Sequence, residues 1–437
     1  MRLTSYINQL NAPVDNTSLV IFRIVFGFLI AAESFGAILT GWVKRVFVDP
    51  EFTFSFIGFE WLQPLPGYGM YFYYGLMGVC GLMVMVGFLY RSSLGLFTLL
   101  WWAAYLMQKT SYNNHYYLLI LLCFLMLLVP AHGNASLDSQ RNPEIRSTTC
   151  PKWCIELFKW QLLIVYTYAA LAKLYPGWLE GDFIALSFGN KADYPLVGEW
   201  LQSKLLQRTV IFGGFLFDLT IIPLMWWSKT RNIGLISSII FHLFNSVIFG
   251  IGIFPYLMLG SLVLFYPTSH WQSKIPGYIT GPESVAFRTH KILIPMLAVY
   301  FAFQLWLPVR HYFIPGNVFL TEEGHRMAWR MMLRSKWGSV HYKVVNKASG
   351  EDWVVLPGQH LSPKQARKIA GRPDLIWQFS RILQKKYQEE GIENLEIYAI
   401  TKTYLNTTEI NTLIDPEIDL LSVPWNRFGH NSWVLIE

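Results

Sequence analysis

Long apolar runs recur through the first 310 residues of the chain and predict a bundle of membrane-spanning helices. A spanning helix needs roughly 20 mainly apolar residues. Candidate runs lie at 19–41, 68–89, 92–108, 115–131, 153–174, 207–227, 231–249, 253–267 and 288–308. The third and eighth runs are short, so the pattern predicts about nine spans and leaves eight open.

After Pro308 charged residues become common and the long apolar runs stop. Residues 341–346 and 352–356 read as short strands, and the alternation at 395–399 is typical of a half-buried strand. Ser362 and Pro363 predict a helix start, since serine accepts a backbone N–H and proline suits the first turn. A second helix is expected over 373–390, with one apolar stripe. Residues 311–437 are therefore predicted to form a small α+β domain, separate from a membrane domain at 1–310.

The basic residues of the short loops predict how the bundle is oriented. Lysine and arginine are enriched in cytoplasmic loops of membrane proteins. If the N-terminus is cytoplasmic, the basic loop residues at that face lie at 2, 91, 141–152, 229–231 and 274–288. Lys44 and Arg45 fall on the opposite side as the main exception. This predicted topology makes the C-terminal domain extracytoplasmic.

Composition supports a membrane protein and argues against several other classes. The chain is 53% hydrophobic and 14% charged, whereas soluble domains carry about 25% charged residues. The net charge of +7 comes from scattered loop residues, so we expect the lipid bilayer and no nucleic acid as a partner. No nucleophile-elbow, phosphate-loop or dinucleotide motif is present, which disfavours hydrolase and nucleotide-driven enzymes.

The four cysteines indicate neither a metal site nor a disulfide framework. Cys150 and Cys154 have the spacing C-x3-C, which matches no zinc or redox pattern. The predicted topology places them on the cytoplasmic side, so we expect reduced thiols. We therefore expect no bound metal.

Four ionisable residues interrupt the apolar runs: Arg23, Glu33, Asp218 and His242. An ionisable group inside a membrane marks a functional site by default. Two roles stay open for them, namely mutual pairing that locks the bundle, or chemistry. Asn245 follows His242 by one helical turn and adds a second polar group to that face.

Two polar motifs stand at the mouths of predicted spans. Residues 111–115 read Ser-Tyr-Asn-Asn-His and open the fourth run, ending on His115. Residues 172–178 read Ala-Lys-Leu-Tyr-Pro-Gly-Trp and close the fifth run with Lys173. A lysine at a span end commonly extends to the interface and does nothing more, but a desolvated lysine loses its proton easily and becomes an amine base. The predicted topology brings His115 and Lys173 to the same membrane face.

Taken in order, these segments resemble the vitamin K-dependent gamma-glutamyl carboxylases, the group with a horizontally transferred transmembrane (HTTM) domain. The likeness rests on an ordered set of segments that runs through most of the chain. They are 20–27 (VIFRIVFG), 109–118 (KTSYNNHYYL), 172–181 (AKLYPGWLEG), 241–246 (FHLFNS), 258–266, 329–332 (WRMM), 414–419 (IDPEID) and 431–434 (NSWV).

The resemblance implies a membrane enzyme that converts protein glutamate to gamma-carboxyglutamate with CO2 and O2. Reduced vitamin K, or menaquinol, would be epoxidised in the same reaction. The resemblance implies that Lys173 takes a proton from the hydroquinone and that His115 assists by hydrogen bonding. It also implies quinone contacts at Asn114, His242 and Asn245.

The substrate, a glutamate-containing protein or peptide, is an anion at its reacting side chain. Basic residues follow the last predicted span at His325, Arg326, Arg330, Arg334 and Lys336. Because arginine can grip a carboxylate through two hydrogen bonds, we expect Arg330, Arg334 and Lys336 to bind the substrate. A solvated face or lipid-headgroup contacts are the alternative.

The sequence departs from the animal members in two respects. It lacks the cysteines that bridge their first outer loop to the C-terminal domain, and its outer domain is short. It therefore looks like a bacterial-type member, expected in the inner (plasma) membrane. A related quinone-dependent enzyme with another substrate stays open, as does a non-enzymatic transporter or scaffold. A transporter would favour two matching halves with interrupted helices, and no such repeat is apparent.

Overall fold

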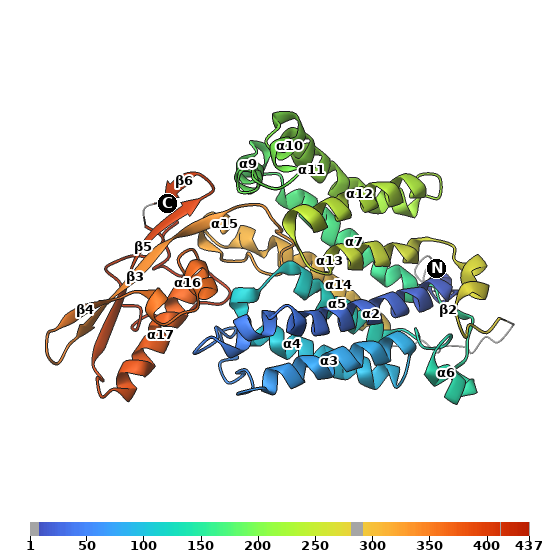
Figure 1. The fold of residues 1–437 in the computed structure, drawn as a ribbon, viewed down its shortest axis with the longest axis horizontal. Coiled ribbons are helices and arrows are strands. Elements are labelled where there is room, and N and C mark those ends of the chain that lie inside the picture. Colours follow the sequence, from blue (N-terminus) through green and yellow to red (C-terminus); the bar gives the residue numbers. More distant parts are fainter. Residues whose placement is uncertain (1–7, 281–291, 411, 437) are drawn as a thin grey trace.

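The computed structural model describes residues 8–280, 292–410 and 412–436. A long helical bundle carries the N-terminus at one end and the C-terminal domain at the other (Figure 1). Arg2, Arg288 and the first residues of the ninth predicted span lie outside the described residues. The helices that coincide with the nine apolar runs are α2 (Thr17–Leu39), α3 (Gly69–Val86), α4 (Tyr90–Met107), α5 (Asn114–Leu128), α7 (Trp153–Ala172), α11 (Lys204–Trp226), α12 (Arg231–Phe249), α13 (Phe254–Ser261) and α14 (Leu293–Trp306).

The predicted count of nine spans is not confirmed. Among the described residues, six helices are long and apolar enough to cross a membrane: α2, α3, α7, α11, α12 and the segment Leu293–Phe313, which includes α14. The apolar segments Asn114–Leu128 and Phe254–Phe265 are shorter. α4 has 18 residues but begins with the polar stretch Tyr-Arg-Ser-Ser.

Small residues let α2 and α3 approach closely at the centre of the bundle. A Cβ on Gly81 would lie 2.6 Å from the backbone nitrogen of Ala31, and one on Gly27 would collide with the backbone at Met85. Such contacts are typical of helix pairs in membranes, where packing rather than the hydrophobic effect drives association. In contrast, α11 and α12 expose large apolar side chains at Phe212, Leu216, Ile236, Ile240 and Val247, as expected of a surface that faces lipid.

The expectation that the buried ionisable groups pair with one another is wrong for Arg23 and Glu33. Arg23 donates to the backbone carbonyls of residues 131, 134 and 135 at 3.3, 3.3 and 2.6 Å. Glu33 instead accepts a hydrogen bond from Tyr116 at 2.9 Å. Both groups hold the bundle together, Arg23 through the loop that follows α5 and Glu33 through a tyrosine of α5.

The end of the bundle that carries the N-terminus is tied together by short polar contacts. Strand β1 (Pro13–Asp15) pairs antiparallel with β2 (Thr149–Pro151). Asn134 bonds to the backbone of residue 279 at 3.1 and 2.9 Å. The four cysteines are free and buried, which agrees with the reduced thiols expected at Cys150 and Cys154.

The predicted elements of the C-terminal domain are confirmed. A four-stranded antiparallel sheet has the order β4-β3-β5-β6. The strands are β3 (Lys336–Asn346), β4 (Asp352–Val355), β5 (Leu395–Leu405) and β6 (Thr408–Ile410). Ser362 caps α16 (Pro363–Ile369) in a capping box with Gln365. The apolar stripe of α17 (Pro373–Glu389) packs under the sheet through Leu375, Ile376, Phe379 and Leu383.

The domain docks on the bundle through the loop between α2 and α3. Phe52 and Phe54 of this loop lie against Phe379, with ring centroids 6.0 and 6.5 Å apart. Gln365 and Gln378 donate to backbone carbonyls of the same loop at 2.9 and 3.1 Å. Apolar packing and amide hydrogen bonds therefore hold this contact.

Candidate active site

The polar motif at 111–115 builds the mouth of the site, and four of its residues serve local structure. Asn113 caps α5 by accepting the backbone N–H three residues on, at 2.7 Å. Tyr112 donates to Asn114 at 2.8 Å, and Ser111 accepts from a lysine of α16 at 2.8 Å. His115 is different, because its ring stacks on Phe254 with centroids 3.8 Å apart. No hydrogen-bond partner of His115 occurs among the described residues.

Lys173, at the C-terminal end of α7, forms an ion pair with Asp218 of α11. Both side chains are buried, at 10% and 5% exposure, so the lysine does not extend to the interface. Its Nζ also lies 5.3 Å from the ring centroid of Trp178. A charge pair this far from water is costly unless it is well compensated, which favours a functional role over an anchoring one.

A small cavity, here called the base cavity, has Lys173 and Asp218 in its wall together with His115, His242 and Asn245. Its volume is about 90 Å³. His242 contacts Tyr166 of α7 through Nε2 at 2.9 Å. Its Nδ1 is buried and, among the described residues, has no hydrogen-bond partner. Such an unsatisfied buried nitrogen is a place where a ligand hydroxyl can bind.

A second cavity of about 170 Å³, the arginine chamber, adjoins the base cavity. The two share His115, Met331 and Met332 in their walls. The chamber is cationic, and the basic side chains that line it are Lys109, Arg326, Arg330 and Arg372, with His325 beside them. Its one acidic lining residue among the described residues is Glu322.

Most charges near the arginine chamber are already paired. Asp374 of α17 binds Lys109 at 2.7 Å and Arg326 at 2.8 and 3.2 Å. Glu322 binds Arg334, and Lys336 lies 3.7 Å from it. Burial by itself would raise the pKa of Glu322, but these cations and His325 hold it well below its usual range.

Arg330 and Arg372 are the exceptions. In the described part of the chain, neither has a carboxylate within ion-pairing distance, and Arg330 contacts the ring of His311 instead, at 2.5 Å. Burial, together with the nearby Arg334, lowers the pKa of Arg330 to about 10. Burial also lowers the pKa of Arg372. Both guanidinium groups therefore gain from an added anion.

The segment 326–333 joins the two cavities and is strained. Met327, Trp329 and Met332 have positive φ values of 58°, 56° and 52°, which is costly for side chains of this size. The two polar motifs hold the segment in place. Asn114 donates to the carbonyl of residue 330 at 3.1 Å, and Tyr175 donates to that of residue 333.

The structure thus gathers most of the predicted site residues and separates a few. Lys173, His115, His242 and Asn245 line one cavity. Asn114 lies instead at the arginine chamber, where its side chain bonds to the protein. Arg334 and Lys336 face Glu322 and not the open chamber.

Sequence reasoning missed several residues of the site. Tyr166 lies two helical turns before Lys173, so the two side chains share one face of α7. The helical periodicity could therefore have placed Tyr166 in the site. Met331 and Met332 belong to a segment quoted for the resemblance but received no role. No sequence pattern marked Arg372, just before α17, as a site residue, because only the docking of the C-terminal domain brings it to the chamber.

Comparison with known protein families agrees with this geometry. The HTTM domain model matches residues 11–271, which is more than half of the chain. The model of the vitamin K-dependent gamma-carboxylase lumenal domain matches residues 289–437. No solved structure matches the chain. The two matches are consecutive and together cover the bundle and the C-terminal domain, so the chain belongs to the vitamin K-dependent gamma-carboxylase family.

Proposed function

We propose that this protein is a gamma-carboxylase that takes a proton from a reduced quinone with Lys173 and carboxylates a glutamate held at the arginine chamber. The observation that carries the proposal is the juxtaposition of the two cavities. One surrounds a buried amine with mainly apolar walls, and the other presents two guanidinium groups, those of Arg330 and Arg372, that have no carboxylate partner within the described part of the chain. They meet at His115 and the two methionines.

The residues of the base cavity suit the ring of reduced vitamin K or menaquinol. The walls are mainly aromatic and aliphatic. Lys173, His115 and the Nδ1 of His242, which has no hydrogen-bond partner among the residues described, offer partners for ring hydroxyls. Ligand cavities usually measure roughly 300–1,000 Å³, so about 90 Å³ requires the walls to open. Met331 and Met332 are flexible side chains suited to that movement.

The reaction needs a base stronger than any side chain, because the γ-proton of a glutamate is very weakly acidic. When bound, the reduced quinone would supply that base through its reaction with O2. In our proposal the neutral amine of Lys173 accepts the proton of a quinol hydroxyl at Nζ, and Asp218 pairs with the ammonium group that forms. His115 donates or accepts a hydrogen bond at the same ring. The apolar walls keep water from quenching the reactive groups.

The arginine chamber then orients the substrate. Arg330 and Arg372 would bind the side-chain carboxylate of the glutamate, which leaves its γ-carbon directed at His115 and the base cavity. Arg334 and Lys336, which the sequence suggested as direct ligands, act in our proposal by holding Glu322. The peptide itself approaches from the side of the C-terminal domain.

The decisive experiment incubates the purified protein with labelled CO2, O2, reduced vitamin K or menaquinol, and a glutamate peptide. We expect label in gamma-carboxyglutamate and an equal amount of quinone epoxide. Epoxide without a carboxylated peptide would show a related quinone-dependent enzyme with another substrate. Neither product from any quinol would contradict the proposal and favour a transporter or scaffold.

We further propose a bacterial inner-membrane location with the C-terminal domain on the outer face. The basic loops near residues 141–152 and 229–231 support this orientation. A reporter fused after Glu437 should be active outside, and one inserted between 134 and 146 should be active inside. A C-terminal reporter active only in the cytoplasm would contradict it.

A further inference from the structure

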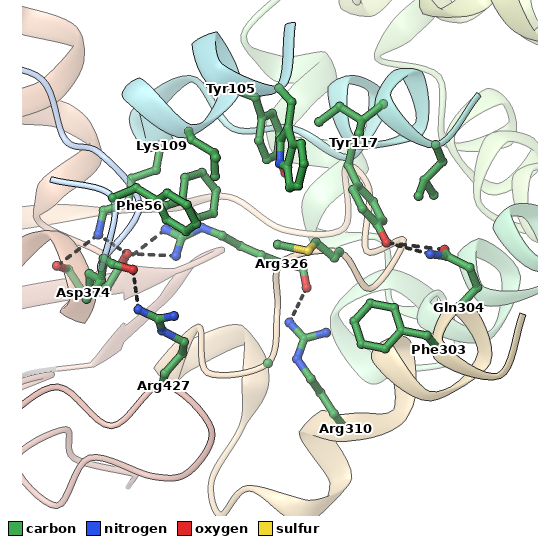
Figure 2. A pocket seen from close by; sticks show the side chains of 18 of the residues that line it. Phe56, Tyr105, Lys109, Tyr117, Phe303, Gln304, Arg310, Arg326, Asp374 and Arg427 are labelled. Atoms are coloured by element: carbon green, nitrogen blue, oxygen red, sulfur yellow. Dashed lines mark hydrogen bonds and ion pairs between the residues drawn. The ribbon is translucent and has the colours of Figure 1, made fainter. Parts of the chain in front are cut away.

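A third and much larger cavity adjoins the arginine chamber, with which it shares Lys109, Glu322 and Arg326, but has no described lining residue in common with the base cavity. It measures about 700 Å³ and lies between α4, α5 and α14, below the C-terminal domain. Figure 2 shows its charged side chains, Lys109, Arg326, Asp374, Arg310 and Arg427, near one another, with Tyr117 and Gln304 facing each other beside them. We call it the α4–α14 cavity.

This cavity and the base cavity lie on opposite faces of α5. His115 faces the base cavity, whereas Ile120, Phe124 and Leu128 face the α4–α14 cavity. At 100° per residue these positions point roughly away from His115. Because the two cavities have no described lining residue in common, the site proposed for the quinol ring does not extend into this space.

The cavity is apolar along the bundle and open toward the lipid. Its walls run from Tyr117 to Leu128 on α5, an axial rise of about 16 Å. Across from them Met296 and Phe303 of α14 are 46% and 51% exposed, and Phe124 is 38% exposed. The hydrogen bond between Tyr117 and Gln304, at 3.1 Å, bridges the gap near its polar end. A hydrocarbon chain from the bilayer can enter sideways and lie along α5.

The polar end of the cavity carries uncompensated positive charge. Its three acids are engaged: Asp374 with Lys109 and Arg326, Glu322 with Arg334, and Glu323 with His430 and Asn431. Arg310 and Arg427 have no carboxylate within 4.0 Å among the described residues. Arg310 donates to the carbonyls of residues 307 and 326, and Arg427 donates to that of Ile57 at 2.5 Å. Their remaining N–H groups can bind an anion.

We propose that the α4–α14 cavity binds an anionic phospholipid. Its phosphate would lie between Arg310 and Arg427, and an acyl chain would fill the space between α5 and α14. Two guanidinium groups at the polar end select a negative headgroup, since basic pockets between membrane helices bind anionic lipid heads. The apolar length selects a lipid over a free anion. Such a lipid would also hold α14 and the C-terminal domain in register with the bundle.

The test measures lipid retention on the full-length protein. The detergent-purified protein is delipidated and supplied with equal amounts of phosphatidylglycerol and phosphatidylcholine that carry the same acyl chains. Native mass spectrometry then counts the retained lipids. We expect phosphatidylglycerol to be retained with roughly tenfold preference, the value of one charged hydrogen bond. Equal retention of both lipids, or retention of neither, overturns the proposal.

Variants locate the site. Arg427→Gln, at an exposed position, should abolish most of the preference, and Arg310→Gln should do the same if the variant folds. Arg91→Gln is the matched control, because Arg91 is an exposed arginine on α4 that also donates to a backbone carbonyl, at 3.1 Å. Met296→Trp should fill the apolar part and reduce retention of both lipids. Equal preferences in Arg427→Gln and Arg91→Gln, or normal retention in Met296→Trp, would place the lipid elsewhere.

Discussion

The base cavity and the arginine chamber share a wall but treat charge in opposite ways. In the base cavity the amine of Lys173 has one carboxylate partner, Asp218, and the remaining walls are mainly apolar. In the arginine chamber the cations outnumber the acids, so that Arg330 and Arg372 are left without a carboxylate among the described residues. A matched pair suits proton transfer, because a proton can move without leaving an isolated charge. Unmatched cations suit the binding of an anion.

The comparison also explains why the strained segment 326–333 lies between the cavities. Its Arg326 and Arg330 line the chamber, and its Met331 and Met332 line both cavities. Polar groups of both motifs clamp its backbone. A shift of this one segment would therefore change both sites together, which couples substrate binding to access at the quinol site.

The largest effect should come from Lys173→Arg. Arginine keeps the ion pair with Asp218, so the protein should fold, but a guanidinium stays protonated and cannot act as a base. We expect epoxidation and carboxylation to fall by about 10²–10⁴-fold, the usual contribution of a general base. Epoxide and labelled CO2 are measured in parallel.

Lys159→Arg is the matched control, because Lys159 pairs with Glu156 on the same helix at 3.1 Å. It should retain full activity. Lys173→Ala should be as inactive as the arginine variant, and a small exogenous amine should restore part of its activity. Full epoxidation by Lys173→Arg would falsify the role of Lys173 as a base. The base cavity could then no longer be distinguished from the arginine chamber as the place of proton transfer.

The next effect is on stability, at the ion pairs that hold the chamber in place. Asp374→Asn leaves Lys109 and Arg326 buried without a carboxylate, which typically costs about 3–5 kcal/mol. Thermal unfolding should show this loss, while the pair Lys343–Asp352, about half exposed, offers Asp352→Asn as a nearly silent control. If Asp374→Asn left the thermal stability unchanged, the C-terminal domain would not need these charges to dock.

The ion pairs of Asp374 with Lys109 and Arg326 also make the stability of the protein depend on pH. Burial alone would raise the pKa of Asp374, but Arg326 and Lys109 hold it well below the usual value. A depressed carboxylate stabilises the fold above its unfolded pKa, about 3.9, and this stability is lost as pH falls further. The wild type should therefore lose stability below about pH 4 more steeply than Asp374→Asn.

A smaller effect is expected at the substrate cations. Arg330→Ala should raise KM for the glutamate peptide by roughly tenfold to a hundredfold, as expected for a charged hydrogen bond, with little change in KM for the quinol. Arg334→Ala is the comparison, because its guanidinium binds Glu322. It should destabilise the protein more than it weakens peptide binding. Equal changes in both KM values for Arg330→Ala would count against carboxylate binding.

Much of the fold could be predicted from the sequence, because the apolar runs and the strand alternation are local signals. Strands β3, β4 and β5 and helices α16 and α17 were located from such signals, as was the Ser362 cap, whereas the short strand β6 was not predicted. The span count was harder, since α4, α5 and α13 combine short length with polar ends. Lys173 and His115 were found from polar motifs that interrupt apolar runs.

The charge partners could not be predicted, because they depend on contacts between distant segments. Asp218 lies 45 residues from Lys173 in sequence, and Asp374 lies 265 from Lys109. Arg334 and Lys336 read as free cations beside the last span, but the turn that carries Glu322 folds back onto them. Whether a cation is free for a substrate is therefore a tertiary property.

The smallest effect on rate, and the sharpest test of the matched pair, comes from Asp218→Asn. Asparagine keeps the shape and can still accept a hydrogen bond from Lys173, so the amine stays in place while the negative charge beside it is lost. Epoxidation should therefore change only a few-fold. Glu156→Gln, which removes the partner of Lys159 on the same helix, should leave the epoxidation rate unchanged. If Asp218→Asn were as inactive as Lys173→Arg, the carboxylate would itself have to carry the proton, and the pair would act as one base instead of a lysine held by its partner.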